Sequence, residues 1–85
     1  MFDLTPLIEE AFLNESRVSQ DQYDAFKKAF KRRCLFTYVG CIFQGEYDSR
    51  LDEYTVWGYR KSLYYEINIL GDMRLSVREL EVQMY

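Results

Sequence analysis

Two different hydrophobic periods divide this chain near Cys34, and the change of period limits the folds that are open to it. Before Cys34, apolar residues recur at the three- and four-residue spacing of amphipathic helices. From residue 35 to residue 70, β-branched and aromatic side chains dominate, and the last part of this stretch alternates apolar with polar residues. Helices followed by strands indicate an α+β fold. With 85 residues, the chain is expected to form a single domain over residues 1–85.

The first predicted helix begins at Thr5-Pro6 and ends near Asn14. Thr5 is a suitable N-cap, and proline is favoured at the first helical position. The apolar side chains at helical spacing are Leu7, Ile8, Ala11 and Phe12.

The second predicted helix begins with a Ser-x-x-Gln capping box, formed by Ser19 and Gln22. Val18 and Tyr23 are placed as its hydrophobic staple. We expect Asp24 to pair with Lys28 one turn later. The expected apolar face comprises Tyr23, Phe26, Ala29 and Phe30. The bases on the other side are Lys27, Lys28, Lys31 and Arg32.

Three strands are expected over residues 35–43, 54–59 and 63–70. The first has no plainly polar face, so we expect it to be central in the sheet. The polar residues 44–53 predict a loop, and Gly71-Asp72 predicts a two-residue hairpin turn.

The C-terminal segment fits two patterns. Ser76 and Glu79 match a capping box that opens a helix, whereas Leu80, Val82 and Met84 alternate as in a strand. We expect a short fourth strand followed by a C-terminal helical turn. The whole pattern predicts two N-terminal helices packed on one face of a three- or four-stranded antiparallel sheet.

The absence of His limits the chemistry that this chain can perform. Imidazole is the side chain most used for proton transfer near neutral pH and the commonest transition-metal ligand. Cys34 and Cys41 have neither a His base nor further cysteines for a zinc site. The acidic segment 46–53 lacks the spacing of an EF-hand loop, and no phosphate-binding or nucleophile-elbow motif occurs. We therefore expect no enzymatic activity, no cofactor and no metal site.

Aromatic side chains are abundant, with 8 Tyr, 6 Phe and 1 Trp. If the helices cover one face of the sheet, several strand aromatics must lie on the other, where they suit a contact surface. Because so short a chain covers its first strand poorly, we expect a protein partner or a homodimer. The candidate partner-binding residues are Phe36, Tyr38, Tyr54, Trp57, Tyr59 and Tyr64.

The bases of residues 27–33 form an alternative contact site. The candidates for contacts with phosphate or with an acidic partner are Lys27, Lys28, Lys31 and Arg32. The net charge is nevertheless −3, and Asp21 and Asp24 lie on the same side of the helix. We therefore expect no more than weak binding of nucleic acid.

These patterns favour a small non-catalytic module for protein–protein interaction. In size, acidity and lack of catalytic motifs it is similar to accessory proteins of viruses and mobile elements. That analogy implies an inhibitor of a host enzyme or defence factor. The competing hypothesis is a nucleic-acid-binding protein that uses the basic half of the second helix. No apolar run approaches the roughly 20 residues of a membrane span, and the N-terminus lacks a basic signal region, so we expect a cytoplasmic location.

Overall fold

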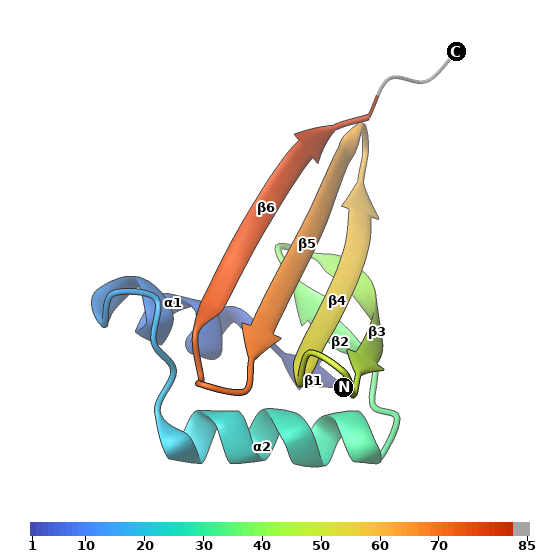
Figure 1. The fold of residues 1–85 in the computed structure, drawn as a ribbon. Coiled ribbons are helices and arrows are strands. Elements are labelled where there is room, and N and C mark those ends of the chain that lie inside the picture. The colour runs from blue at the N-terminus through green and yellow to red at the C-terminus, as the bar shows by residue number, and fades with distance from the viewer. Residues whose placement is uncertain (83–85) are drawn as a thin grey trace.

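Within residues 1–82, which the computed structural model describes, two helices and one six-stranded sheet make up the fold (Figure 1). The helices are α1 (Thr5–Leu13) and α2 (Gln20–Lys31). The strands are β1 (Phe2–Asp3), β2 (Phe36–Tyr38), β3 (Cys41–Asp48), β4 (Glu53–Arg60), β5 (Leu63–Leu70) and β6 (Leu75–Glu81). They follow one another across the sheet in chain order, β1 parallel to β2 and all later neighbours antiparallel. The predicted α+β class is confirmed, but the sheet is larger than predicted and mixed.

Helix α1 has the predicted extent but a narrower buried face. Asp3, not Thr5, supplies the side-chain contact at its start, because Oδ1 of Asp3 accepts from the Thr5 N–H at 2.9 Å. The prediction that Phe12 belongs to the apolar face is wrong, since this side chain is 69% exposed. The stripe that faces the sheet is already filled at helical spacing by Leu4, Leu7, Ile8 and Ala11.

Helix α2 follows the prediction closely. The Ser19 hydroxyl accepts from the Gln22 N–H at 3.3 Å, and the staple residues Val18 and Tyr23 are buried. The reciprocal contact of the capping box comes from α1, where Glu10 accepts from the Ser19 N–H at 2.7 Å. The predicted pairing partner of Asp24 is corrected: its ion pair is with Lys27, at 3.8 Å and three residues away.

The predicted strand over residues 35–43 is a hairpin instead. Strands β2 and β3 are joined by Val39 and Gly40, which have φ of 49° and 76°. Glycine adopts this left-handed conformation without a steric penalty, so Gly40 marks a turn and not a strand interior. The predicted loop 44–53 shrinks correspondingly to 49–52, because β3 continues to Asp48.

Strands β4 and β5 match their predictions, whereas the C-terminal segment does not. The link from β5 to β6 is longer than the predicted two-residue turn. The Leu70 N–H donates to the Arg74 carbonyl at 2.9 Å, and Met73 has φ of 67°. Strand β6 then pairs continuously with β5 from Leu75 to Glu81, so the predicted helical turn is wrong over these residues. Pairing with β5 satisfies the backbone of this segment. The rest of that prediction, residues 83–85, lies outside the described residues.

Both helices pack on the same face of the sheet, and the core lies between these two layers (Figure 1). The sheet contributes alternate residues of its strands to this core. On β4 and β5 these buried side chains are Tyr54, Val56, Tyr65, Ile67 and Ile69. From α2, the Phe26 ring centroid lies 5.3 Å from that of Phe36 and 5.4 Å from that of Tyr54.

Two glycines in the sheet make room for aromatic rings of this core. A Cβ atom on Gly45 would lie 2.6 Å from the Phe30 ring, and one on Gly58 would lie 2.6 Å from the Phe43 ring. Both distances are shorter than van der Waals contact. The glycines therefore let these rings pack directly against the backbone of β3 and β4.

Candidate functional site

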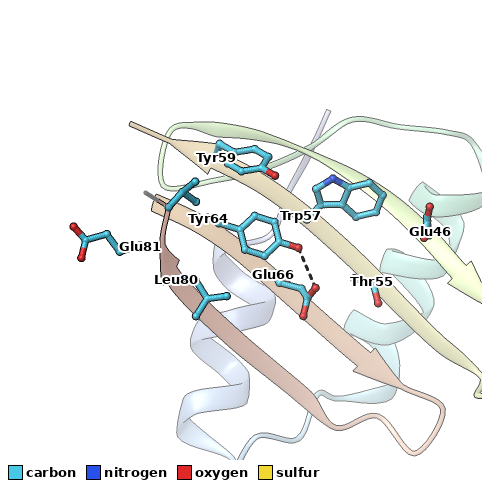
Figure 2. Close-up of a pocket in the computed structure, with 9 residues that line it drawn as sticks. Glu46, Thr55, Trp57, Tyr59, Tyr64, Glu66, Leu80 and Glu81 are labelled. Carbon is cyan, nitrogen blue, oxygen red and sulfur yellow. Dashed lines mark hydrogen bonds between the residues drawn. The ribbon is translucent and has the colours of Figure 1, made fainter. Parts of the chain in front are cut away.

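The face of β3–β6 that is turned away from both helices is the candidate site, and we call it the open face (Figure 2). Its side chains form rows across the strands. The first row is Tyr59, Tyr64 and Leu80, and the second is Gln44, Trp57, Glu66 and Arg78. The third is Glu46, Thr55, Asn68 and Ser76, and the fourth begins with Asp48, Glu53 and Leu70.

Three aromatic side chains gather at one end of the open face. Tyr59 is 62% exposed, and Trp57 and Tyr64 are half-buried. The ring centroids of Tyr59 and Tyr64, which are cross-strand neighbours, lie 5.2 Å apart. These rings and their neighbours border a shallow groove of about 610 Å³, whose lining includes Glu46, Trp57, Tyr59, Tyr64, Glu66 and Leu80 (Figure 2). This end of the open face therefore offers apolar area together with polar edges.

A chain of hydrogen bonds orders the polar side chains of the groove. The Tyr64 hydroxyl donates to Oε1 of Glu66 at 3.0 Å (Figure 2). The Asn68 side-chain amide donates to Oε2 of Glu66 at 3.2 Å. On β4, the Thr55 hydroxyl donates to Oδ1 of the Asn68 side chain at 2.7 Å. Burial, followed by the hydrogen bond to Glu66, raises the pKa of Tyr64. Tyr64 therefore remains a neutral donor at physiological pH, and the Glu66 carboxylate is held in position.

The open face is predominantly acidic. The four rows contain one base, Arg78, and four carboxylates, those of Glu46, Asp48, Glu53 and Glu66. Asp48 forms an ion pair with Arg50 of the neighbouring loop, with 3.4 Å between Oδ1 of Asp48 and Nε of Arg50. The remaining excess of negative charge gives this face a negative potential that favours a basic partner.

The structure divides the six predicted aromatic contact residues between two faces. Trp57, Tyr59 and Tyr64 share the open face, as expected. Phe36 and Tyr54 do not, because they face the helices and are 3% and 9% exposed. Tyr38 is also on the core side, half-buried, with its ring centroid 6.2 Å from that of Tyr65.

Sequence reasoning did not select the polar part of the site. Glu66, Asn68 and Thr55 were missed as functional candidates. The alternation of residues 63–70 does place Tyr64, Glu66 and Asn68 on one face of a strand. That pattern was a usable signal for β5, but the neighbours from β3, β4 and β6 depend on the strand register.

The predicted basic site lies on the other side of the molecule, on α2. Lys28, Lys31 and Arg32 are exposed there. Lys27 already contacts two side chains of α2: its Nζ lies 3.8 Å from the Asp24 carboxylate and 4.6 Å from the centroid of the Tyr23 ring. The C-terminal half of α2 thus carries a basic patch, and the open face of the sheet is acidic.

The two cysteines are free thiols in different environments. Cys41 is buried in the core, and Cys34 is half-buried and packs against the edge of this core. Within residues 1–82, no group of three or more His, Cys, Asp or Glu side chains is placed to hold a metal ion. Over the same residues, neither helix has the length and apolar character that crossing a membrane requires.

The chain was compared with protein-family models, with curated proteins and with solved structures, and none of these comparisons found a match. The fold and site define the class of protein: a two-layer α+β protein with helices on one face of its sheet and an aromatic, acidic open face on the other.

Proposed function

We propose that this protein is a non-catalytic protein-binding module whose contact surface is the open face of β3–β6. Its partner is a protein that presents basic side chains. The observation that carries the proposal is the group Trp57, Tyr59 and Tyr64, which lies on the side of the sheet away from both helices.

The composition of the open face supports binding of a protein. Trp and Tyr are the residues most enriched among those that dominate the affinity of protein interfaces. They supply large contact areas while their polar atoms still reach water or a partner. The acidic rows next to them favour a basic partner and disfavour the phosphates of nucleic acid.

The more specific expectation, inhibition of a host enzyme by a protein of viral or mobile-element type, stays a prediction. So does the location in the cytoplasm. Self-association through an aromatic strand surface also stays a prediction. Its contact residues would be Trp57, Tyr59 and Tyr64, because Phe36 is buried.

The alternative proposal is binding of nucleic acid through α2. It would use the exposed bases Lys28, Lys31 and Arg32 on the helix layer. The ion pair of Lys27 with Asp24 reduces the charge available there. Submicromolar, salt-sensitive binding of RNA or DNA, abolished by replacement of the four bases with Ser, would favour this alternative over the open face.

Site-specific photo-crosslinking tests the main proposal. A benzophenone amino acid replaces Tyr59 on the open face in one variant and Lys28 on α2 in a matched variant. We expect a protein partner to crosslink at position 59 and not at position 28. An excess of unmodified protein should suppress the crosslink, whereas an excess of the Trp57→Ala variant should not. Crosslinks at position 28 alone, or equal competition by Trp57→Ala, would contradict the proposal.

A further inference from the structure

We infer that the open face holds a site for one arginine side chain of the partner, with the guanidinium group over the Trp57 indole and beside the Glu66 carboxylate. This inference rests on the proposed function, because it names the chemistry by which the open face recognises its partner.

Strand register places the ring and the carboxylate together. Trp57 on β4 and Glu66 on β5 are directly opposite each other on the open face. The Cβ atoms of such a pair are about 4.5–5.5 Å apart. Trp is the ring that attracts cations best, at distances up to about 6 Å from its centroid. One cation can therefore contact the Trp57 ring and the Glu66 carboxylate at the same time, within the groove of about 610 Å³.

The Glu66 carboxylate can accept further hydrogen bonds from a cation. Each of its oxygens accepts one hydrogen bond, from Tyr64 at 3.0 Å and from Asn68 at 3.2 Å. A carboxylate oxygen has two lone pairs, so each oxygen retains one acceptor position. Among residues 1–82, no Lys or Arg forms an ion pair with Glu66, although the side chain is half-buried. The negative charge of Glu66 is thus fixed in place and still open to a cation.

Arginine fits this arrangement better than lysine. A guanidinium group is planar, stacks on aromatic rings and donates two parallel hydrogen bonds to a carboxylate. The ammonium group of lysine can contact a ring and a carboxylate, but it is more strongly hydrated and lacks the planar fork that donates two parallel hydrogen bonds. The first row of the open face, Tyr59, Tyr64 and Leu80, lies next to this position and provides apolar area for the arginine stem.

The protein already contains one cation held in this way. Nζ of Lys27 lies 4.6 Å from the centroid of the Tyr23 ring and 3.8 Å from the Asp24 carboxylate. On the open face, the nearest cross-strand base is Arg78, which lies opposite Glu66 on β6. Arg78 is exposed and competes with an incoming guanidinium group for the same carboxylate.

Titration with a model peptide tests the site. The probe is acetyl-Gly-Ser-Gly-Arg-Gly-Ser-Gly-amide, and its control has citrulline, an uncharged analogue of similar shape, in place of arginine. The chain has one Trp, so a single indole N–H resonance reports on Trp57. We expect a saturable shift of this resonance at millimolar concentrations of the arginine peptide. The citrulline peptide should bind about fivefold more weakly or worse.

Matched variants then test the role of the carboxylate. Glu66→Gln should weaken binding of the arginine peptide about fivefold while the far-UV circular dichroism spectrum is unchanged. Glu9→Gln makes the same change of charge on an exposed position of α1 and should leave the affinity unaltered. Arg78→Gln should bind the peptide more tightly, because it removes the competing base.

The inference would be overturned by equal affinities for the arginine and citrulline peptides, by full binding in Glu66→Gln, by loss of binding in Arg78→Gln, or by an indole resonance that does not respond. None of these results depends on the partner crosslinked at position 59. The proposed function and the arginine site can therefore fail separately.

Discussion

The Tyr64 hydroxyl donates a hydrogen bond of 3.0 Å to Glu66, two residues further along the same face of β5. Residues at this spacing project side by side from a strand, so the bond requires no departure from regular strand geometry. The contacts of Asn68 and Thr55 extend it across to β4. Although it faces solvent, the open face therefore has ordered side chains.

The Tyr64–Glu66 bond predicts a difference between two neighbouring tyrosines. Tyr64→Phe should lower the free energy of unfolding by about 0.5–1 kcal/mol, because it leaves Glu66 with one hydrogen bond fewer. Within residues 1–82 the Tyr59 hydroxyl has no protein hydrogen-bond partner, so Tyr59→Phe should change stability by less than about 0.5 kcal/mol. Urea denaturation measures both variants. Equal losses would show that the bond contributes nothing measurable.

Packing, and not charge, should dominate the contribution of α2 to stability. Phe26 is fully buried among Phe36 and Tyr54, so Phe26→Ala should destabilise the fold by about 3–5 kcal/mol. Lys28 is exposed, and Lys28→Ala should change stability by less than about 0.5 kcal/mol. Thermal or urea denaturation of the two variants checks the order. A larger loss for Lys28→Ala would contradict the orientation of the helix.

Tyr47 should titrate well above an ordinary tyrosine. Its hydroxyl donates to Asp52 at 2.8 Å, and this bond, with smaller effects of burial and charge, raises the pKa of Tyr47 from 10.0 to about 12. Because the pKa is raised in the folded state, the stabilisation is fully present below pH 10.0 and is lost as the pH rises through about 12. NMR titration of the Tyr47 ring measures this value directly. In Asp52→Asn, which removes the charge, the pKa should fall toward 10.0. An unchanged titration would exclude Asp52 as the cause.

Local sequence signals predicted the elements whose stability depends on near neighbours in the chain. Ser19 and the buried residues of α2 follow from capping chemistry and helical spacing. The alternation of β5 correctly places Tyr65, Ile67 and Ile69 in the core.

The errors arose where tertiary pairing decided between local alternatives. The match of Ser76 and Glu79 to a capping box was overridden by pairing of β6 with β5. Phe36 and Tyr54 could not be separated from Trp57 by composition, because assignment to a face depends on the strand register and on which face the helices cover. The Val39-Gly40 turn was missed because the apolar run continues on both sides of it.

The most direct test of the central claim is the affinity of the partner crosslinked at position 59, measured by isothermal titration calorimetry. Three proteins are compared: the wild type, Trp57→Ala, and a variant with Lys27, Lys28, Lys31 and Arg32 replaced by Ser. We expect Trp57→Ala to weaken binding by more than about 1–2 kcal/mol, since aromatic anchors dominate interface energies. The four-base variant should retain wild-type affinity. Loss of binding in the four-base variant, together with wild-type affinity in Trp57→Ala, would contradict the account. It would show that the binding surface is on α2 and not on the open face.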